Sequence, residues 1–152
     1  MVKEGTTAPS FKTTDANGEP VNLKDFRGKK VVLYFYPKDD TPGCTKEACS
    51  FRDAFSRFKK QGITILGVSP DSEKSHQKFT AKYKLPFTLL ADTDHSIADA
   101  YGVYGEKKFM GRTYMGIHRT TFLIDEKGKI KKVFEKVKPE DHADEVLGAF
   151  SG

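Results

Sequence analysis

Runs of consecutive apolar residues divide the chain and predict its buried strands. Residues 31–36 and 63–69 are rich in β-branched and aromatic types, as in strands covered on both faces. Residues 87–90 predict a third, shorter strand. Between the first two runs, apolar residues recur at spacings of three and four, which predicts one amphipathic helix over residues 44–61 that ends at Gly62.

Turn signals place further strands near both ends of the chain. Asn17-Gly18 lies between two short extended runs, which predicts an N-terminal hairpin within residues 11–23. Residues 119–125 and 129–137 predict two more strands joined by a tight turn. These strands follow the alternating part of the chain, so we expect them to extend the sheet as an antiparallel pair.

Three further helices follow from capping signals and periodicity. Asp71-Ser72 can cap a helix that carries Phe79 and Tyr83, and residues 96–101 predict a short helix before Gly102. Pro139 suits the start of a last helix. The apolar face of that helix consists of Ala143, Val146, Leu147 and Phe150.

Alternation of strands and helices predicts an α/β domain. We expect a mixed central sheet with helices on both faces and an N-terminal hairpin, compatible with a thioredoxin-like three-layer fold. A length of 152 residues suits one domain over residues 1–152.

Charge and composition narrow the classes of partner. The net charge is +5, and the densest basic stretch, residues 127–138, is interpreted as the solvated face of a strand. No nucleic-acid-binding motif accompanies it, so no nucleic-acid partner is expected. The N-terminus lacks the apolar core of a signal peptide, and no run approaches the ~20 apolar residues that span a bilayer. We therefore expect a cytoplasmic protein without a membrane partner.

Two cysteines carry the candidate chemistry. Cys44 follows a buried strand and a polar loop and falls in the first turn of the predicted helix. Free backbone N–H groups and the helix dipole stabilise an anion there, and thiolates are the nucleophilic form of cysteine. In a reducing compartment, cysteines more often serve redox chemistry than structure. The alternative for an isolated Cys44 is a small buried apolar residue.

The spacing of Cys44 and Cys49 constrains what they can do. Five residues on an ideal helix separate the two Cα atoms by about 8–9 Å, whereas a disulfide needs roughly 4.4–6.8 Å. Either the cysteines never bond, or the first helical turns unwind. The spacing does not suit a zinc site, none of the four histidines pairs with a cysteine at ligand spacing, and no metal or other cofactor is expected.

The loop before Cys44 resembles the active-site motif of the peroxiredoxins. The motif is Pro37-x-x-x-Thr41-x-x-Cys44, and the longer string with Cys49 looks like the peroxiredoxin Q branch, also called bacterioferritin comigratory protein. Further similar segments are Ala8-Pro9-x-Phe11, Gly67-Val68-Ser69 and residues 119–125. The resemblance covers nearly the whole chain.

The resemblance implies a role for each residue of the site. Cys44 would be the peroxidatic cysteine, which attacks the O–O bond, and Cys49 the resolving cysteine. Thr41 would hydrogen-bond the thiolate and the peroxide. Arg119 would stabilise the charge, with Glu47 as a supporting residue that orients it. Taken without the motif, Thr41 is a capping residue and Arg119 a surface residue.

Two prolines and the remaining residues near the motif receive simpler interpretations. Pro37 and Pro42 would limit loop motion and shield the thiolate from water. His118, beside Arg119, is interpreted as structural. Four apolar residues either line an approach to the site or pack in the ordinary way. They are Phe109, Met110, Tyr114 and Met115.

The implied activity is an atypical 2-Cys peroxidase that reduces hydrogen peroxide and organic hydroperoxides. Cys44 would become a sulfenic acid, Cys49 would condense with it to an intramolecular disulfide, and thioredoxin or a similar dithiol would reduce that bond. A monomer is expected. The alternatives are a general thiol–disulfide oxidoreductase, disfavoured by the cysteine spacing, and a basic chaperone-like binding module with incidental cysteines.

Overall fold

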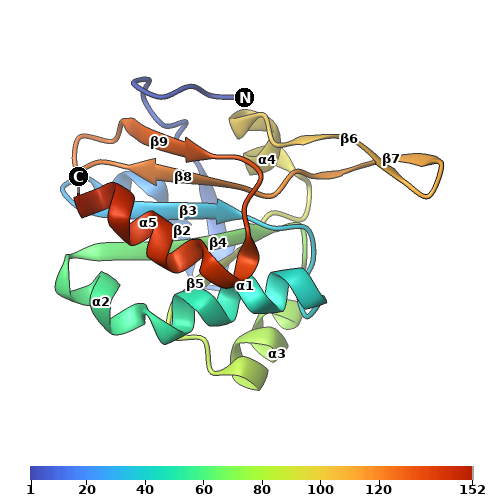
Figure 1. Ribbon diagram of the computed structural model, residues 1–152, viewed down its shortest axis with the longest axis horizontal. Coiled ribbons are helices and arrows are strands. Elements are labelled where there is room, and N and C mark those ends of the chain that lie inside the picture. The colour runs from blue at the N-terminus through green and yellow to red at the C-terminus, as the bar shows by residue number, and fades with distance from the viewer. Residues whose placement is uncertain (152) are drawn as a thin grey trace.

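The computed structural model describes residues 1–151 and shows helices on both sides of a central sheet (Figure 1). The strands of the sheet are β1 (Lys12–Asp15), β2 (Pro20–Asn22), β3 (Lys30–Phe35), β4 (Ile63–Ser69), β5 (Thr88–Ala91), β8 (Thr120–Ile124) and β9 (Ile130–Phe134). They lie in the order β2-β1-β5-β4-β3-β8-β9. β3, β4 and β5 are parallel, and the outer strands pair antiparallel. The expected mixed sheet and N-terminal hairpin are confirmed.

Alternation along β3 divides the core into two layers. Val32 and Tyr34 point to one face, and Val31 and Leu33 to the other. The helices of the first face are α1 (Pro42–Asp53), α2 (Phe55–Lys60), α3 (Glu73–Tyr83) and α5 (His142–Ser151), the last preceded by the 3-10 turn η2 (Pro139–Asp141). The second face holds α4 (Ser96–Tyr101), the 3-10 turn η1 (Leu23–Phe26) and the N-terminal segment.

The helix predicted over residues 44–61 is wrong in its continuity. The structure divides it at Ala54, whose φ of −98° and ψ of 4° interrupt the helical path between α1 and α2. Phe51 and Phe58 on either side of the break remain in contact, with ring centroids 5.7 Å apart. The apolar spacing is kept across the break, which is why periodicity alone did not reveal it.

Residues 102–118 were assigned no element, yet they contain a second hairpin. Its strands are β6 (Tyr104–Phe109) and β7 (Arg112–Ile117), and it projects beyond the rest of the molecule (Figure 1). Met110 and Gly111 form its turn, both with positive φ. Its side chains are mostly exposed, so no continuous apolar run marks the two strands in the sequence.

No helix within residues 1–151 is long and apolar enough to cross a bilayer.

Helix α3 begins as expected, because the Ser72 hydroxyl accepts a hydrogen bond from Ser75 N at 3.1 Å. Gly67 of β4 lies opposite Tyr34 of β3, and a Cβ there would come within 2.8 Å of the tyrosine ring. Glycine at this position therefore lets Tyr34 lie flat under α1, where its ring contacts Phe51.

Candidate active site

The site lies where β3 ends and α1 begins. A loop over residues 37–41 joins them, and Pro42 occupies the first turn of α1, where its missing N–H costs no helical bond. Cys44 also lies in this first turn, as predicted, and is 2% exposed. Cys44 therefore lies at the positive end of a helix, in the turn whose backbone N–H groups lack helical partners.

Arg119 reaches this sulfur from the neighbouring strand, because it lies just before β8, whose Thr120 pairs with Phe35 at the end of β3. Its Nη2 donates to Cys44 Sγ at 3.1 Å, and its Nη1 donates to Glu47 Oε1 at 2.7 Å. A Cβ on Gly43 would lie 3.2 Å from Nη2, so the glycine leaves room for the guanidinium beside the helix. The structure thus brings Cys44, Glu47 and Arg119 together, although 75 residues separate Cys44 from Arg119.

Glu47 is a buried carboxyl whose main partner is this arginine. The residue is fully buried, and its Oε2 has no hydrogen-bond partner among the described residues. Burial raises the pKa of Glu47 to about 7, although the charge and hydrogen bond of Arg119 act to lower it. The same contacts with Glu47 and Cys44 raise the pKa of Arg119 against the effect of its burial.

Thr41 and Pro37 lie in the loop that faces this cluster. Thr41 precedes α1 as its N-cap, but its side chain makes no capping bond and its Oγ1 donates to Lys38 O at 2.8 Å. Pro37 is half-buried directly after Tyr36, and Pro42 is exposed. Thr41 is therefore the N-cap residue of α1 by position, without a side-chain capping bond.

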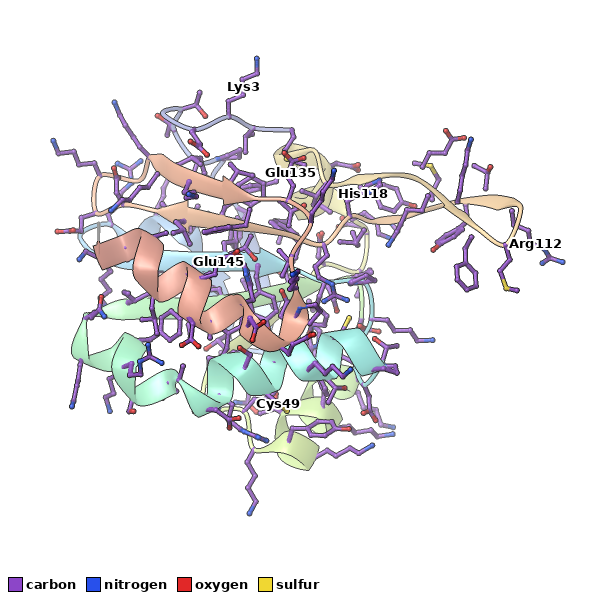
Figure 2. All side chains as sticks on the ribbon, in the orientation of Figure 1. Lys3, Cys49, Arg112, His118, Glu135 and Glu145 are labelled. Carbon is purple, nitrogen blue, oxygen red and sulfur yellow. The ribbon has the colours of Figure 1, made fainter. Side chains whose placement is uncertain are left out.

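Both cysteines are free thiols, and α1 runs without interruption through both. Cys44 is buried and Cys49 half-buried, at the lower edge of α1 in Figure 2. This is the separated arrangement that helix geometry predicts for the reduced form.

A buried polar network, which sequence reasoning missed, holds the loop in place. Asp39 Oδ2 lies 2.7 Å from His76 Nδ1, and its Oδ1 accepts from the Tyr36 hydroxyl at 2.6 Å. His76 Nε2 lies 2.9 Å from the Leu90 carbonyl, which can only accept, so this nitrogen carries a proton. Asp71 Oδ2 accepts from Asp39 N at 2.8 Å. The network ties the loop to α3, β4 and β5.

The remaining sequence candidates lie on the β6–β7 hairpin or at its base. His118 Nε2 contacts Glu106 O at 3.1 Å at the base of the β6–β7 hairpin, which agrees with a structural role. The four apolar residues are exposed on that hairpin by 47–86%, so their interpretation as ordinary packing is wrong and the approach to the site stays a prediction. Within residues 1–151, no group of three or more His, Cys, Asp or Glu is placed to hold a metal ion.

Known proteins share both this sequence and this fold. The AhpC/TSA family model matches residues 5–133. A putative peroxiredoxin bcp from Coxiella burnetii is 54% identical over 147 residues, which cover 97% of each chain. Peroxiredoxin Bcp from Escherichia coli is 51% identical over 146 residues, which cover 96% of this chain and 94% of the relative.

A solved structure of the bacterioferritin comigratory protein from Xanthomonas campestris has the same architecture. It superposes with a TM-score of 0.88 at 40% identity, and covers 93% of this chain and 90% of its own. Its description concerns alkyl peroxide reduction and trapped intermediate and ligand complexes. The likeness confirms the thioredoxin-like fold.

The raised pKa of Glu47 predicts a pH-dependent stability. The folded state holds a proton on Glu47 up to about pH 7, whereas the unfolded chain loses it near 4.5. The free energy of unfolding therefore falls by about 3 kcal/mol for this group as pH rises through this window. Above the window it no longer changes with this group. Glu47→Gln has no carboxyl to titrate at this position. As pH rises from 4 to 8, the variant should therefore gain about 3 kcal/mol in free energy of unfolding relative to wild type.

Denaturant unfolding of the reduced proteins between pH 4 and pH 8 measures this difference. Glu19→Gln, which changes an exposed carboxylate in the β1–β2 turn, is the control and should track wild type. A constant offset between Glu47→Gln and wild type across the range would contradict the prediction.

Proposed function

Because the chain belongs to the AhpC/TSA family, in its peroxiredoxin Q and bacterioferritin comigratory protein branch of thiol-dependent peroxidases, we propose that Cys44 attacks the hydroperoxide and Cys49 resolves the product. The observation that carries the assignment is the 3.1 Å contact between Arg119 Nη2 and Cys44 Sγ at the start of α1. Arg119 contacts Cys44 and Glu47 and makes no hydrogen bond to Cys49 within the described residues, so the two thiols are not equivalent.

The first step is displacement at the peroxide bond. The Cys44 thiolate bonds to one peroxide oxygen, the O–O bond breaks, and the leaving alkoxide or hydroxide takes a proton to become alcohol or water. Negative charge moves from sulfur to the leaving oxygen during this step. A guanidinium beside the sulfur offers donors to both atoms without rearrangement, which lowers the barrier.

Thr41 and Glu47 support this step in different ways. The Thr41 hydroxyl donates to Lys38 O, so its lone pairs remain to accept the O–H of an incoming hydroperoxide. Glu47 holds the other nitrogen of the Arg119 fork and keeps the guanidinium directed at Cys44. Pro37 stiffens the start of the loop.

Resolution joins the two sulfurs. The Cys49 thiolate attacks the sulfur of the Cys44 sulfenic acid, an S–S bond forms, and hydroxide leaves as water. A dithiol protein of the thioredoxin type then reduces the disulfide by exchange and takes the oxidising equivalents. The proposed substrates are hydrogen peroxide and organic hydroperoxides, the acting form is the monomer, and the place of action is the cytoplasm.

The resolving step requires α1 to open at its N-terminal end. The contacts that this opening must break are the Thr45 N to Thr41 O bond, the contacts of Arg119, the packing of the buried Ala48 and the hydrogen bond from Ala143 N to Ser50 Oγ. Further along, Phe51 is fully buried against the rings of Tyr34 and Phe58. Helix ends open at low free energy compared with global unfolding, so we place the opening over residues 43–50, with Phe51 as the fixed point.

The two cysteines should separate in single-turnover experiments. With one equivalent of peroxide, Cys49→Ser should form a Cys44 sulfenic acid at near wild-type rate and then stall. Cys44→Ser should not react at a comparable rate, because its remaining thiol lacks the arginine. Trapping with dimedone followed by mass spectrometry reads the outcome. Fast sulfenic acid formation on Cys49 in Cys44→Ser would reverse the roles.

Arg119 should matter more for peroxide than for a reagent that needs only a thiolate. Arg119→Ala should slow peroxide reduction by about 10²-fold or more, because it removes a donor aimed at the reacting atoms. Alkylation by iodoacetamide should slow less, and Arg119→Lys should recover part of the peroxide rate, since a point charge lacks the two-donor fork. Arg112→Ala, on the exposed hairpin, is the control. If Arg119→Ala slowed peroxide reduction and alkylation equally, Arg119 would not stabilise the transition state of peroxide reduction.

Oxidation should expose α1 locally. Amide hydrogen exchange in residues 43–50 should quicken when wild type is oxidised to the disulfide, while Phe51 and the residues after it stay protected. Cys49→Ser treated with the same peroxide cannot form the bond and should keep its protection. An oxidised wild type with unchanged exchange in residues 43–50, or a disulfide between two chains, would rule out the intramolecular cycle.

A further inference from the structure

The hairpin formed by β6 and β7 leads directly into the proposed active site. Figure 2 shows Arg112 at its far tip and His118 at its base, next to Arg119 in the sequence. Most of the charged side chains on the hairpin are exposed, namely Glu106, Lys108 and Arg112. Lys107 is half-buried instead.

The Lys107 side chain folds back toward the body of the protein. Its Nζ donates a hydrogen bond to Ile117 O at 2.8 Å, two residues before Arg119. The ammonium therefore lies at the base of the hairpin, beside the segment that carries the arginine, and not in the solvent around the tip.

Gly116 has no side chain, and this leaves space for the Lys107 side chain to fold back. In the hairpin register Lys107 lies opposite Tyr114. A Cβ on Gly116 would lie 3.2 Å from Lys107 Cδ and 3.4 Å from Tyr114 Cε2, so both side chains pass over this glycine. An ammonium on an exposed hairpin would otherwise be free to point into water, and this packing fixes its direction.

The charges of the site act on this ammonium. Burial and the positive charge of Arg119 lower the pKa of Lys107, and the charge on Cys44 raises it. Lys107 therefore belongs to the same electrostatic cluster as the thiol and the arginine. Lys107 and Arg119 are thus two cations at the segment where the hairpin meets β8, and Arg119 contacts Cys44 directly.

We propose that Lys107 is a second cation of the peroxide site and that it favours hydroperoxides carrying an anionic group. The proposal rests on the roles proposed above for Cys44 and Arg119. Strand alternation puts Phe109 on the same face as Lys107, and Tyr114 lies opposite Lys107 in the pair. This face offers apolar surface beside a fixed ammonium, which suits an organic hydroperoxide with an apolar body and a carboxylate.

Two matched peroxides test the proposal. Cumene hydroperoxide and its para-carboxylated derivative share a reacting group and a frame and differ by one charge. The second-order rate constant for oxidation of Cys44 is measured with each in the reduced protein, and the charged-to-neutral ratio is compared among variants. Lys107→Met should lower this ratio about three- to tenfold, the size of effect expected from removing one partly screened charge near the reacting group.

Three further variants and added salt sharpen the test. Lys107→Arg should keep most of the wild-type ratio, and Gly116→Ala should lower it, because the new methyl group displaces the lysine chain. Lys108→Met, which removes the neighbouring exposed cation, is the control and should keep the ratio. High salt should lower the ratio in wild type more than in Lys107→Met.

An unchanged ratio in Lys107→Met would overturn the proposal. So would equal slowing with both peroxides, because that result assigns Lys107 to holding the hairpin alone. A wild-type protein in which neither peroxide oxidises Cys44 would instead refute the proposed function, and the two failures are therefore distinguishable.

Discussion

The ion pair between Glu47 and Arg119 is the interaction on which the site depends. A fully buried carboxyl destabilises the fold when it ionises, and replacing such pairs by apolar residues often stabilises proteins. The carboxyl of Glu47 is explained by the direction that it gives to the Arg119 side chain. One nitrogen of the guanidinium is held by Glu47, so the other must point at Cys44. Arg119, just before β8, thus contacts both Glu47 and the Cys44 sulfur of α1 in a fixed geometry.

Around this pair, the fold separates what must stay rigid from what must move. The loop before α1 is held by the hydrogen bonds among Asp39, His76 and Tyr36. Beyond its first turns, the helix is held by the rings that pack around Phe51. The segment between them is held by helical bonds, by Arg119, by the buried side chain of Ala48 and by a hydrogen bond from Ala143 N to Ser50 Oγ, and the proposed opening must give these contacts up. In the proposed cycle, the disulfide takes Cys44 Sγ away from Arg119, so the contact that holds the helix start in the reduced protein is given up only when the two sulfurs join.

Much of this architecture was predictable from local patterns. The buried strands were marked by uninterrupted apolar runs, because strands covered on both faces need no polar positions. The place of Cys44 in the first turn followed from a strand, a polar loop and a helical periodicity in sequence. The break at Ala54 did not, because it leaves the apolar spacing of Phe51 and Phe58 intact.

The contacts that escaped prediction are polar and long-range. Asp39 and His76 lie 37 residues apart, and each alone resembles an ordinary loop or helix residue. Lys107 is one of several charges on a hairpin that has no continuous apolar run to mark its strands, and its direction is decided by Gly116, two residues beyond its cross-strand partner Tyr114. Hydrophobic burial leaves a periodic record in the sequence, whereas a hydrogen bond or ion pair depends on where two distant elements finally meet. The residues that tune a site are therefore harder to read from the sequence than the residues that build its scaffold.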